Sequence, residues 1–172
     1  YAMLSLGLAV IFGLLGVVNF AHGALYMIGA YVAWYGMDRW GINYWWALLL
    51  GPLLVGILGV VIERLLLKRL YKLDPLYGLL ATFGLALIFQ GVFQQYYGSS
   101  GQSYAPPEQL SGATNLGFMF LPNYRGWVVL VSLAVCFGTW FLIERTQLGA
   151  LLRAGTENPA LVQAFGVNVP LM

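Results

Sequence analysis

Residues 15–31 read LGVVNFAHGALYMIGAY and hold one short polar island, Asn19 to Gly23, within residues 1–37, which carry no formal charge. This uncharged run is too long for a single membrane crossing, which needs about 20 residues. The island therefore marks a turn of the chain or a break in a membrane helix. A break at membrane depth leaves backbone groups that lipid cannot satisfy, so it must face protein or a water-filled cavity. Such a pattern is more typical of transport proteins than of membrane anchors.

The composition predicts an integral membrane protein. Hydrophobic residues make up 60% of the chain and charged residues 8%, whereas an ordinary soluble domain has roughly 25% charged residues. The single cysteine, Cys136, cannot form an intramolecular disulfide, so cysteine usage does not indicate the compartment. The chain opens at Tyr1 inside an apolar stretch and stops at Met172 just after a polar one. We interpret it as part of a longer protein, truncated at both ends.

The predicted fold class is an all-α polytopic helix bundle that forms one transmembrane domain over residues 1–172. Strand-like alternation is absent, and helices are then the structure that can span a membrane. Asp74 before Pro75 is expected to cap the fourth span, and Asn43 the third. The five predicted transmembrane helices lie at about 1–18, 20–37, 45–62, 76–95 and 127–143.

Basic residues predict the orientation, because cytoplasmic loops are enriched in Lys and Arg. Residues 63–74 and 144–157 hold six of them, and 38–44 and 96–125 hold only Arg39 and Arg125. The two richer segments are therefore predicted to be cytoplasmic, with the Asn19 island near the same side. The six are Arg64, Lys68, Arg69, Lys72, Arg145 and Arg153.

No group of residues suits hydrolysis, redox chemistry or metal binding. The chain has one histidine and one cysteine, no carboxylate pair within the predicted spans, and no Walker-type glycine loop. We therefore expect no catalytic residue, no metal site and no cofactor, and we do not expect an enzyme.

Two sets of polar residues are candidates for a translocation path. The first is the island, with Asn19, His22 and Gly23; alternatively, His22 is a hydrogen-bonded structural residue and Asn19 caps the second helix. The second is a stripe on the fourth span, where a buried glutamine must face a partner or water. This stripe either makes interhelical hydrogen bonds or lines the path. Its members are Thr82, Ala86, Gln90 and Gln94.

A short cytoplasmic helix is predicted at about 158–166. Asn158 suits the cap, Pro159 the first position and Gly166 the stop. A helix of about seven residues is not stable alone in water, so it must dock. Its apolar face lies either on this protein's own membrane domain or the lipid surface, or in a groove of a cytoplasmic partner. That face consists of Leu161, Val162 and Phe165.

Several short motifs occur in a fixed order along the whole chain. They are Asn19-Phe20-Ala21-His22-Gly23, Tyr26-Met27-Ile28-Gly29-Ala30-Tyr31, Ile62-Glu63-Arg64, Ala81-Thr82-Phe83-Gly84, Phe89-Gln90, Leu148-Gly149, Arg153-Ala154, Glu157-Asn158 and Phe165-Gly166-Val167-Asn168. As a set they resemble the LivH-type permeases, the membrane subunits of bacterial branched-chain amino acid ABC importers.

The resemblance implies a multi-pass subunit of the bacterial inner membrane without an ATP site of its own. Its partners would be a second related permease, two cytoplasmic ATPases and a periplasmic substrate-binding protein, with no nucleic acid. Residues 157–168 would dock on an ATPase, and 96–125 would meet the binding protein. The implied ATPase contacts are Glu157, Asn158, Leu161, Val162, Phe165 and Gly166.

The expected function is ATP-driven import of leucine, isoleucine and valine by alternating access, in which ATPase closure pulls on residues 157–166. Related importers of urea or short amides have a similar Asn-x-Ala-His-Gly island and are the alternative substrate class. An ion-coupled secondary transporter or channel is a different alternative, although the predicted spans lack acidic residues. A structural membrane scaffold, which would show no nucleotide-dependent flux, is the third.

Overall fold

The computed structural model describes residues 1–15, 19–70, 73–102, 106–115, 120–157 and 162–163, and most of this part of the chain is helical. The chain divides into two compact units. We call Val17–Pro107 the central unit, and Tyr1–Gly16 together with Glu108–Met172 the terminal unit. The first helix of the sequence therefore belongs with the last two, and not with the helices that directly follow it.

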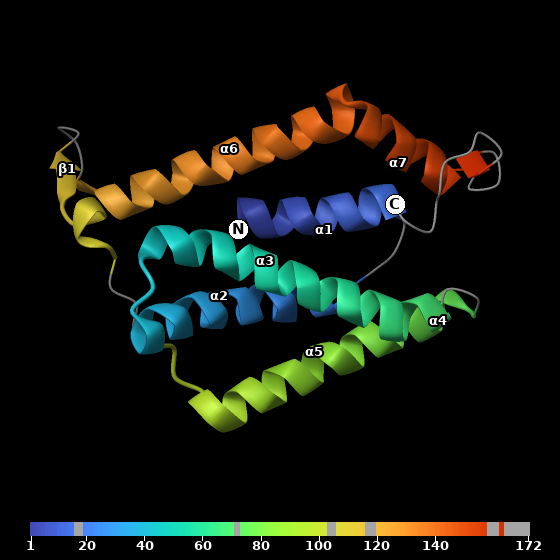
Figure 1. Ribbon diagram of the computed structural model, residues 1–172, viewed down its shortest axis with the longest axis horizontal. Helices are drawn as coiled ribbons and strands as arrows, with labels where there is room; N and C mark the ends of the chain where they lie inside the picture. Colours follow the sequence, from blue (N-terminus) through green and yellow to red (C-terminus); the bar gives the residue numbers. More distant parts are fainter. Residues whose placement is uncertain (16–18, 71–72, 103–105, 116–119, 158–161, 164–172) are drawn as a thin grey trace. The chain divides into compact units, whose positions relative to one another are not determined.

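Three long helices form the central unit: α2 (Ala21–Trp40), α3 (Tyr44–Ile62) and α5 (Pro75–Tyr97). Helix α2 contacts both of the others (Figure 1). A tight turn at Gly41, whose φ of +59° glycine adopts without steric cost, leads from α2 into α3. Beyond Ile62 the helix continues as a π-helical stretch, η1 (Glu63–Leu67), and then as α4 (Lys68–Leu70). The result is a continuous helical segment of 27 residues, Tyr44–Leu70.

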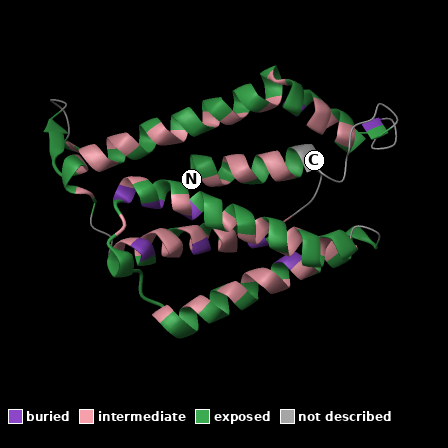
Figure 2. Cartoon of the chain, viewed as in Figure 1, coloured by how far each residue is buried: buried purple, intermediate pink, exposed green. Residues whose placement is uncertain are grey.

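Small residues let α2 and α3 approach closely. A Cβ added to Gly51 would lie 3.5 Å from the carbonyl oxygen of Gly29, and one added to Gly29 would lie 3.3 Å from a methyl group of Val55. Close backbone approach of this kind drives helix association in lipid, where the hydrophobic effect contributes little. The buried residues of this unit lie on α2, α3 and α5 (Figure 2).

The two predicted helix caps have different outcomes. Asp74 Oδ1 accepts a hydrogen bond of 2.9 Å from the Leu76 amide, with Pro75 at the first helical position, so this prediction is confirmed. Asn43 does precede α3, but its side chain makes no capping bond to the described residues. Its backbone carbonyl instead accepts from the amides of Trp46 and Ala47 and closes the first turn. The side-chain part of that prediction is wrong.

The terminal unit combines α1 (Ala2–Leu15), α6 (Asn123–Arg145) and α7 (Gln147–Glu157), and α1 contacts both of the others. Before α6 lie a short 3-10 turn, η2 (Glu108–Leu110), and an antiparallel hairpin of β1 (Ala113–Asn115) and β2 (Phe120–Pro122), in which Thr114 pairs with Leu121. The Thr114 hydroxyl donates to Asn123 Oδ1 over 2.7 Å, which joins the hairpin to the start of α6.

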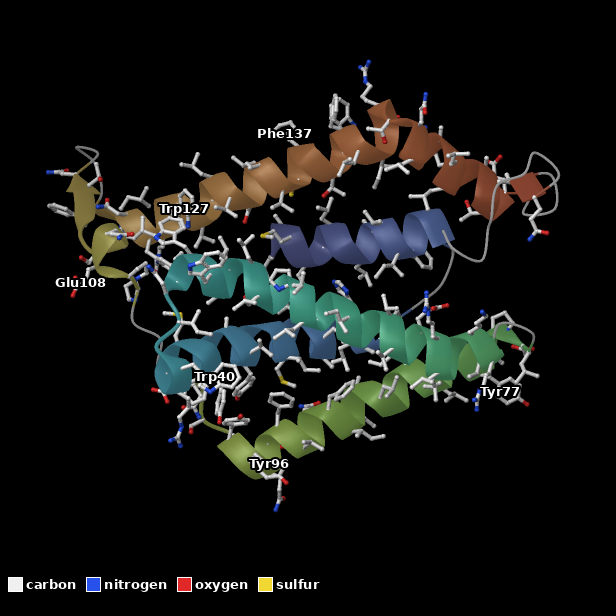
Figure 3. The ribbon with its side chains drawn as sticks, in the orientation of Figure 1. Trp40, Tyr77, Tyr96, Glu108, Trp127 and Phe137 are labelled. Carbon is white, nitrogen blue, oxygen red and sulfur yellow. The ribbon has the colours of Figure 1, made fainter. Side chains whose placement is uncertain are left out.

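Three helical segments of the described chain are long and apolar enough to cross a membrane: Tyr44–Leu70, Pro75–Tyr97 and Asn123–Arg145. They correspond to the third, fourth and fifth predicted spans. No residue of α6 is buried within the chain, and Phe137 near its middle is 66% exposed (Figure 3). A surface so apolar requires lipid or another membrane subunit to cover it.

The predicted helix boundaries differ from the observed ones mainly at the polar ends. Helix α2 continues to Trp40, through Asp38 and Arg39, where the prediction ended at 37. Helix α6 begins at Asn123, where the prediction placed 127. Charged residues end a hydropathy segment but do not end a helix, since Asp costs it little and Arg is a good helix former. The loop expected over 96–125 is correspondingly shorter, and its hairpin strands of three residues are too short to show alternation.

Candidate functional sites at two helix breaks

The polar island marks the start of α2, as predicted. Asn19 Oδ1 accepts a hydrogen bond of 2.9 Å from the Ala21 amide, and the Asn19 carbonyl accepts from the His22 amide at 3.4 Å. The first amides of a helix have no partner within it, and a capping side chain satisfies one of them. Asn19 thus satisfies an amide at the start of α2, as expected of a cap, although it lies one residue before the N-cap, Phe20, whose own side chain makes no capping bond.

A second amide at this point is satisfied from another helix. The Phe20 amide donates to Thr82 Oγ1, 62 residues away on α5, over 3.3 Å. The same hydroxyl donates to the Leu79 carbonyl over 3.0 Å, and Thr82 is only 1% exposed. Beside this bond, the rings of Phe20 and Phe83 meet edge to face with centroids 5.9 Å apart. We call this group, with Asn19 and Ala21, the Asn19 junction.

Of the candidate path residues, the Asn19 junction brings together Asn19 and Thr82. His22 is half-buried and Gly23 is exposed at the start of α2. Gln90 is exposed and lies eight residues beyond Thr82 on α5, about 12 Å along the helix axis. The burial and the two bonds of Thr82 favour the interpretation that it ties helices together.

A second helix break lies in the terminal unit, where α6 and α7 meet at a sharp bend (Figure 1). Thr146 separates them in an extended conformation, with φ −109° and ψ 159°. Its hydroxyl donates to the Leu142 carbonyl at the end of α6 and accepts from the Gly149 amide at 3.4 Å. Thr146 thus caps the start of α7 while its side chain stays attached to α6.

Gly149 allows the bend to be tight. It is the buried residue of α7, and a Cβ built on it would overlap the backbone of Ile143. A larger side chain at this position would force α7 away from the end of α6. The local geometry therefore requires glycine here for space.

Arg153 also connects the two helices, from a position one turn farther along α7 than Gly149. Its Nη1 donates to the Ile143 carbonyl over 3.0 Å and to Glu144 Oε2 over 2.9 Å. The Ile143 carbonyl is among the last four of α6, which have no partner inside the helix, and a cation near a helix C-terminus is favourable. The side chains of Arg153 and Glu144 are 42% and 56% exposed, so the ion pair itself contributes only about 0–1 kcal/mol. We call Leu142, Ile143, Glu144, Thr146, Gly149 and Arg153 the Thr146 bend.

The sequence prediction missed α7 and the bend. Two signals were present: Thr146 suits a helix cap, and Leu148, Leu151 and Leu152 have the spacing of an apolar helical face. The charged residues between 144 and 157 interrupt the apolar pattern, so hydropathy alone does not indicate this helix.

The predicted ATPase contacts lie mostly outside the described residues. This applies to Asn158, Leu161, Phe165 and Gly166. Glu157 is exposed as the last residue of α7. Val162 is 7% exposed within this chain.

The described residues contain no group of three or more His, Cys, Asp or Glu side chains that could hold a metal ion. Cys136 is a free, half-buried thiol on α6. The two helix breaks are therefore sites of backbone hydrogen bonding, with no arrangement for bond-breaking chemistry among these residues.

Comparison with known proteins gives one consistent result. The model of the family described as branched-chain amino acid transport system / permease component matches residues 1–172. The high-affinity branched-chain amino acid transport system permease protein BraD of Pseudomonas aeruginosa is 25% identical, over 98% of this chain and 58% of that protein. The probable branched-chain amino acid transport permease protein LivH of Methanocaldococcus jannaschii is 31% identical, over 97% of this chain and 54% of that protein.

The high-affinity permease protein LivH of Escherichia coli is 24% identical, over 98% of this chain and 58% of that protein. The chain thus spans little more than half the length of these curated relatives. No solved structure matches it.

Proposed function

Since this chain belongs to the family of permease components of branched-chain amino acid transport systems, we propose that it is a membrane-spanning subunit of an ATP-driven importer of leucine, isoleucine and valine. In this proposal a periplasmic binding protein delivers the amino acid, and two cytoplasmic ATPases supply the energy. A second, related permease completes the channel across a bacterial inner membrane.

The resemblance to LivH-type permeases is confirmed over nearly the whole chain. The relatives are named as transport permeases, so the expectation of a transport component and not an enzyme is also confirmed. With three apolar helical segments of spanning length, the chain is a multi-pass membrane protein.

We propose five spans in this chain, with α1 and α2 added to the three longest apolar segments. Helix α2 has 20 residues, which is the length a crossing needs. The orientation follows from charge: Arg64, Lys68 and Arg69 lie where the α3 segment ends, and Arg145 lies where α6 ends. Cytoplasmic ends carry such residues, so α7 would lie on the cytoplasmic side.

The observation that carries the coupling part of the proposal is the continuity from α6 into α7. A helix of spanning length continues through a hydrogen-bonded bend into an amphipathic helix that ends at the exposed Glu157. A partner that moves residues from Glu157 onward would therefore move α6. In the proposed cycle, ATPase closure shifts α7 and α6 together and changes the side of the membrane to which the translocation path opens.

Only part of the polar island around the Asn19 junction is available to line the proposed translocation path. The amides of Phe20 and Ala21 are occupied by Thr82 and Asn19, so these two donors are not available to a substrate carboxylate. His22 and Gly23, which follow in the first turn of α2, are then the candidates to face the path. Gln90 remains a separate candidate further along α5.

Transport in proteoliposomes tests the proposal. The protein carrying this chain is reconstituted with the permease and ATPases encoded beside its gene, and the uptake of radiolabelled leucine and urea is measured with the binding protein present. We expect ATP-dependent leucine uptake without any ion gradient. Uptake driven by an ion gradient without ATP would reject the ATP-driven mechanism, and ATP-dependent uptake of urea alone would reject the substrate class.

The position of acidic residues bears on the ion-driven alternative. Asp38 lies in the last turn of α2, and Glu63 directly follows α3. Asp38 is therefore at a helix end, and Glu63 is among the last eight residues of the continuous Tyr44–Leu70 segment. Both carboxylates lie away from the middle of the span, where ion-coupling groups are expected.

A further inference from the structure

The Thr146 bend is held by contacts at two distances from its corner. Thr146 and Gly149 act at the corner itself, through the first turn of α7. Arg153 acts from the second turn of α7 and contacts α6 nine and ten residues earlier in the chain. A change in the angle between the helices must break the Arg153 contacts first, because they are farthest from the corner.

Arg153 binds two acceptors on α6, one on the backbone and one on a side chain. One nitrogen, Nη1, lies 3.0 Å from the Ile143 carbonyl oxygen and 2.9 Å from Glu144 Oε2. The carbonyl oxygen belongs to the backbone of α6 and cannot follow Arg153 if α7 turns away. The neighbouring cation, Arg145, lies over the Trp140 ring with its guanidinium carbon 5.8 Å from the centroid, so it makes its contact within α6.

We propose that Arg153 is a positioning residue that fixes the direction of α7 relative to α6, so that displacement of the segment after Glu157 is transmitted to α6 and not absorbed at the bend. This inference rests on the proposed function. Arg153 contacts neither substrate nor nucleotide in it. Its effect is on how much of the ATPase movement reaches the membrane helix.

The first measurement is the number of ATP molecules hydrolysed per leucine imported in the reconstituted complex. Arg153→Gln removes both contacts across the bend, and the ratio is expected to rise about threefold or more, within the range for residues that carry coupling between distant sites. Arg145→Gln is the matched control, since it removes the same charge eight residues away without a contact across the bend. Glu144→Gln keeps the carbonyl contact and is expected to have a smaller effect.

The second measurement reports the bend directly. Spin labels are placed at Phe137→Cys on α6 and Thr156→Cys on α7, both exposed positions, in a Cys136→Ala background. The distance distribution between the labels is expected to be narrow in the parent and in Arg145→Gln, and broader in Arg153→Gln. If Arg153→Gln does not accumulate in the membrane, Arg153→Lys replaces it; a lysine does not reproduce the guanidinium geometry, so the same direction is expected.

The two proposals fail in different ways. A parent complex without ATP-driven uptake contradicts the proposed function, and the width of the distance distribution still tests the role of Arg153. A parent complex that transports normally, with an unchanged ATP ratio and distance distribution in the Arg153 variant, overturns the inference alone.

Discussion

The Asn19 junction and the Thr146 bend both lie where a helix begins, but their backbone groups find partners at different distances along the chain. At the Asn19 junction, the Phe20 amide depends on a hydroxyl 62 residues away on another long helix. At the Thr146 bend, every partner lies within ten residues. The Asn19 junction therefore holds separate helices together. The Thr146 bend depends only on nearby residues, so α6 and α7 can move together without changing the angle between them.

The largest effect is expected at the corner of the bend. Gly149→Val places side-chain atoms on the Ile143 backbone, and overpacking of this kind costs about 1–3 kcal/mol. If that strain is relieved by opening the bend, uptake should fall to about a tenth or less, since each 1.4 kcal/mol corresponds to tenfold. Uptake per reconstituted complex is the measurement. Gly155→Ala in the same helix, where a Cβ meets nothing within 4 Å among the described residues, should transport normally.

The next effect is expected at the long-range bond of the Asn19 junction. Thr82→Val keeps the side-chain shape but removes the acceptor of the Phe20 amide, and an unsatisfied buried donor costs about 1–3 kcal/mol. Thermal unfolding in detergent should show the loss, and Thr82→Ser should restore most of it. Thr139→Val is the control, because its hydroxyl bonds to Val135 within α6 and is exposed. Equal loss of stability in the two valine variants would contradict the larger contribution proposed for the bond between Thr82 and Phe20.

A smaller effect is expected from the local cap at the same junction. Asn19→Ala removes the bond to the Ala21 amide and should lower the free energy of unfolding by about 1 kcal/mol, as for other caps. Asn19→Asp retains an acceptor and should be close to the parent in the same unfolding assay. A larger loss from Asn19→Ala than from Thr82→Val would reverse the order proposed for the two bonds.

The smallest effect is expected at the start of α5, where a cap is both local and exposed. The bond from Asp74 to the Leu76 amide can be replaced by water, so Asp74→Ala should cost about 0.5 kcal/mol, the low end for caps. The measurement is again the unfolding midpoint. If Asp74→Ala lowered the unfolding midpoint as much as Thr82→Val, burial would not explain the difference in stability expected between the two bonds.

The local bonds could be predicted from the sequence, whereas the long-range bond could not. Asp74 with Pro75 and Asn19 could be assigned as caps, because the residue types and their local spacing determine those bonds. The partnership of Thr82 with Phe20 could not, because nothing in the sequence indicates which of many small polar residues meets a given amide from another helix. The sequence makes Thr82 a candidate only through its place in a stripe of small or polar residues on α5.

The remaining differences between prediction and structure have physical reasons as well. The hydropathy pattern predicted the three longest apolar segments, since a run of about 20 apolar residues matches the thickness of a bilayer when it is helical. It missed α7, which has only 11 residues and owes its apolar face to three leucines among polar neighbours. It also placed Asn43 correctly but could not tell that the backbone carbonyl, and not the side chain, closes the first turn of α3.

The central claim is that the chain after α7 contacts an ATPase on the cytoplasmic side. Gln163, an exposed and described position, provides the direct test as Gln163→Cys in a Cys136→Ala background. The account predicts that a membrane-impermeant maleimide does not label this cysteine in intact cells, and that a short cross-linker joins it to the ATPase with a yield that changes on adding ATP. Labelling from outside intact cells would contradict the account.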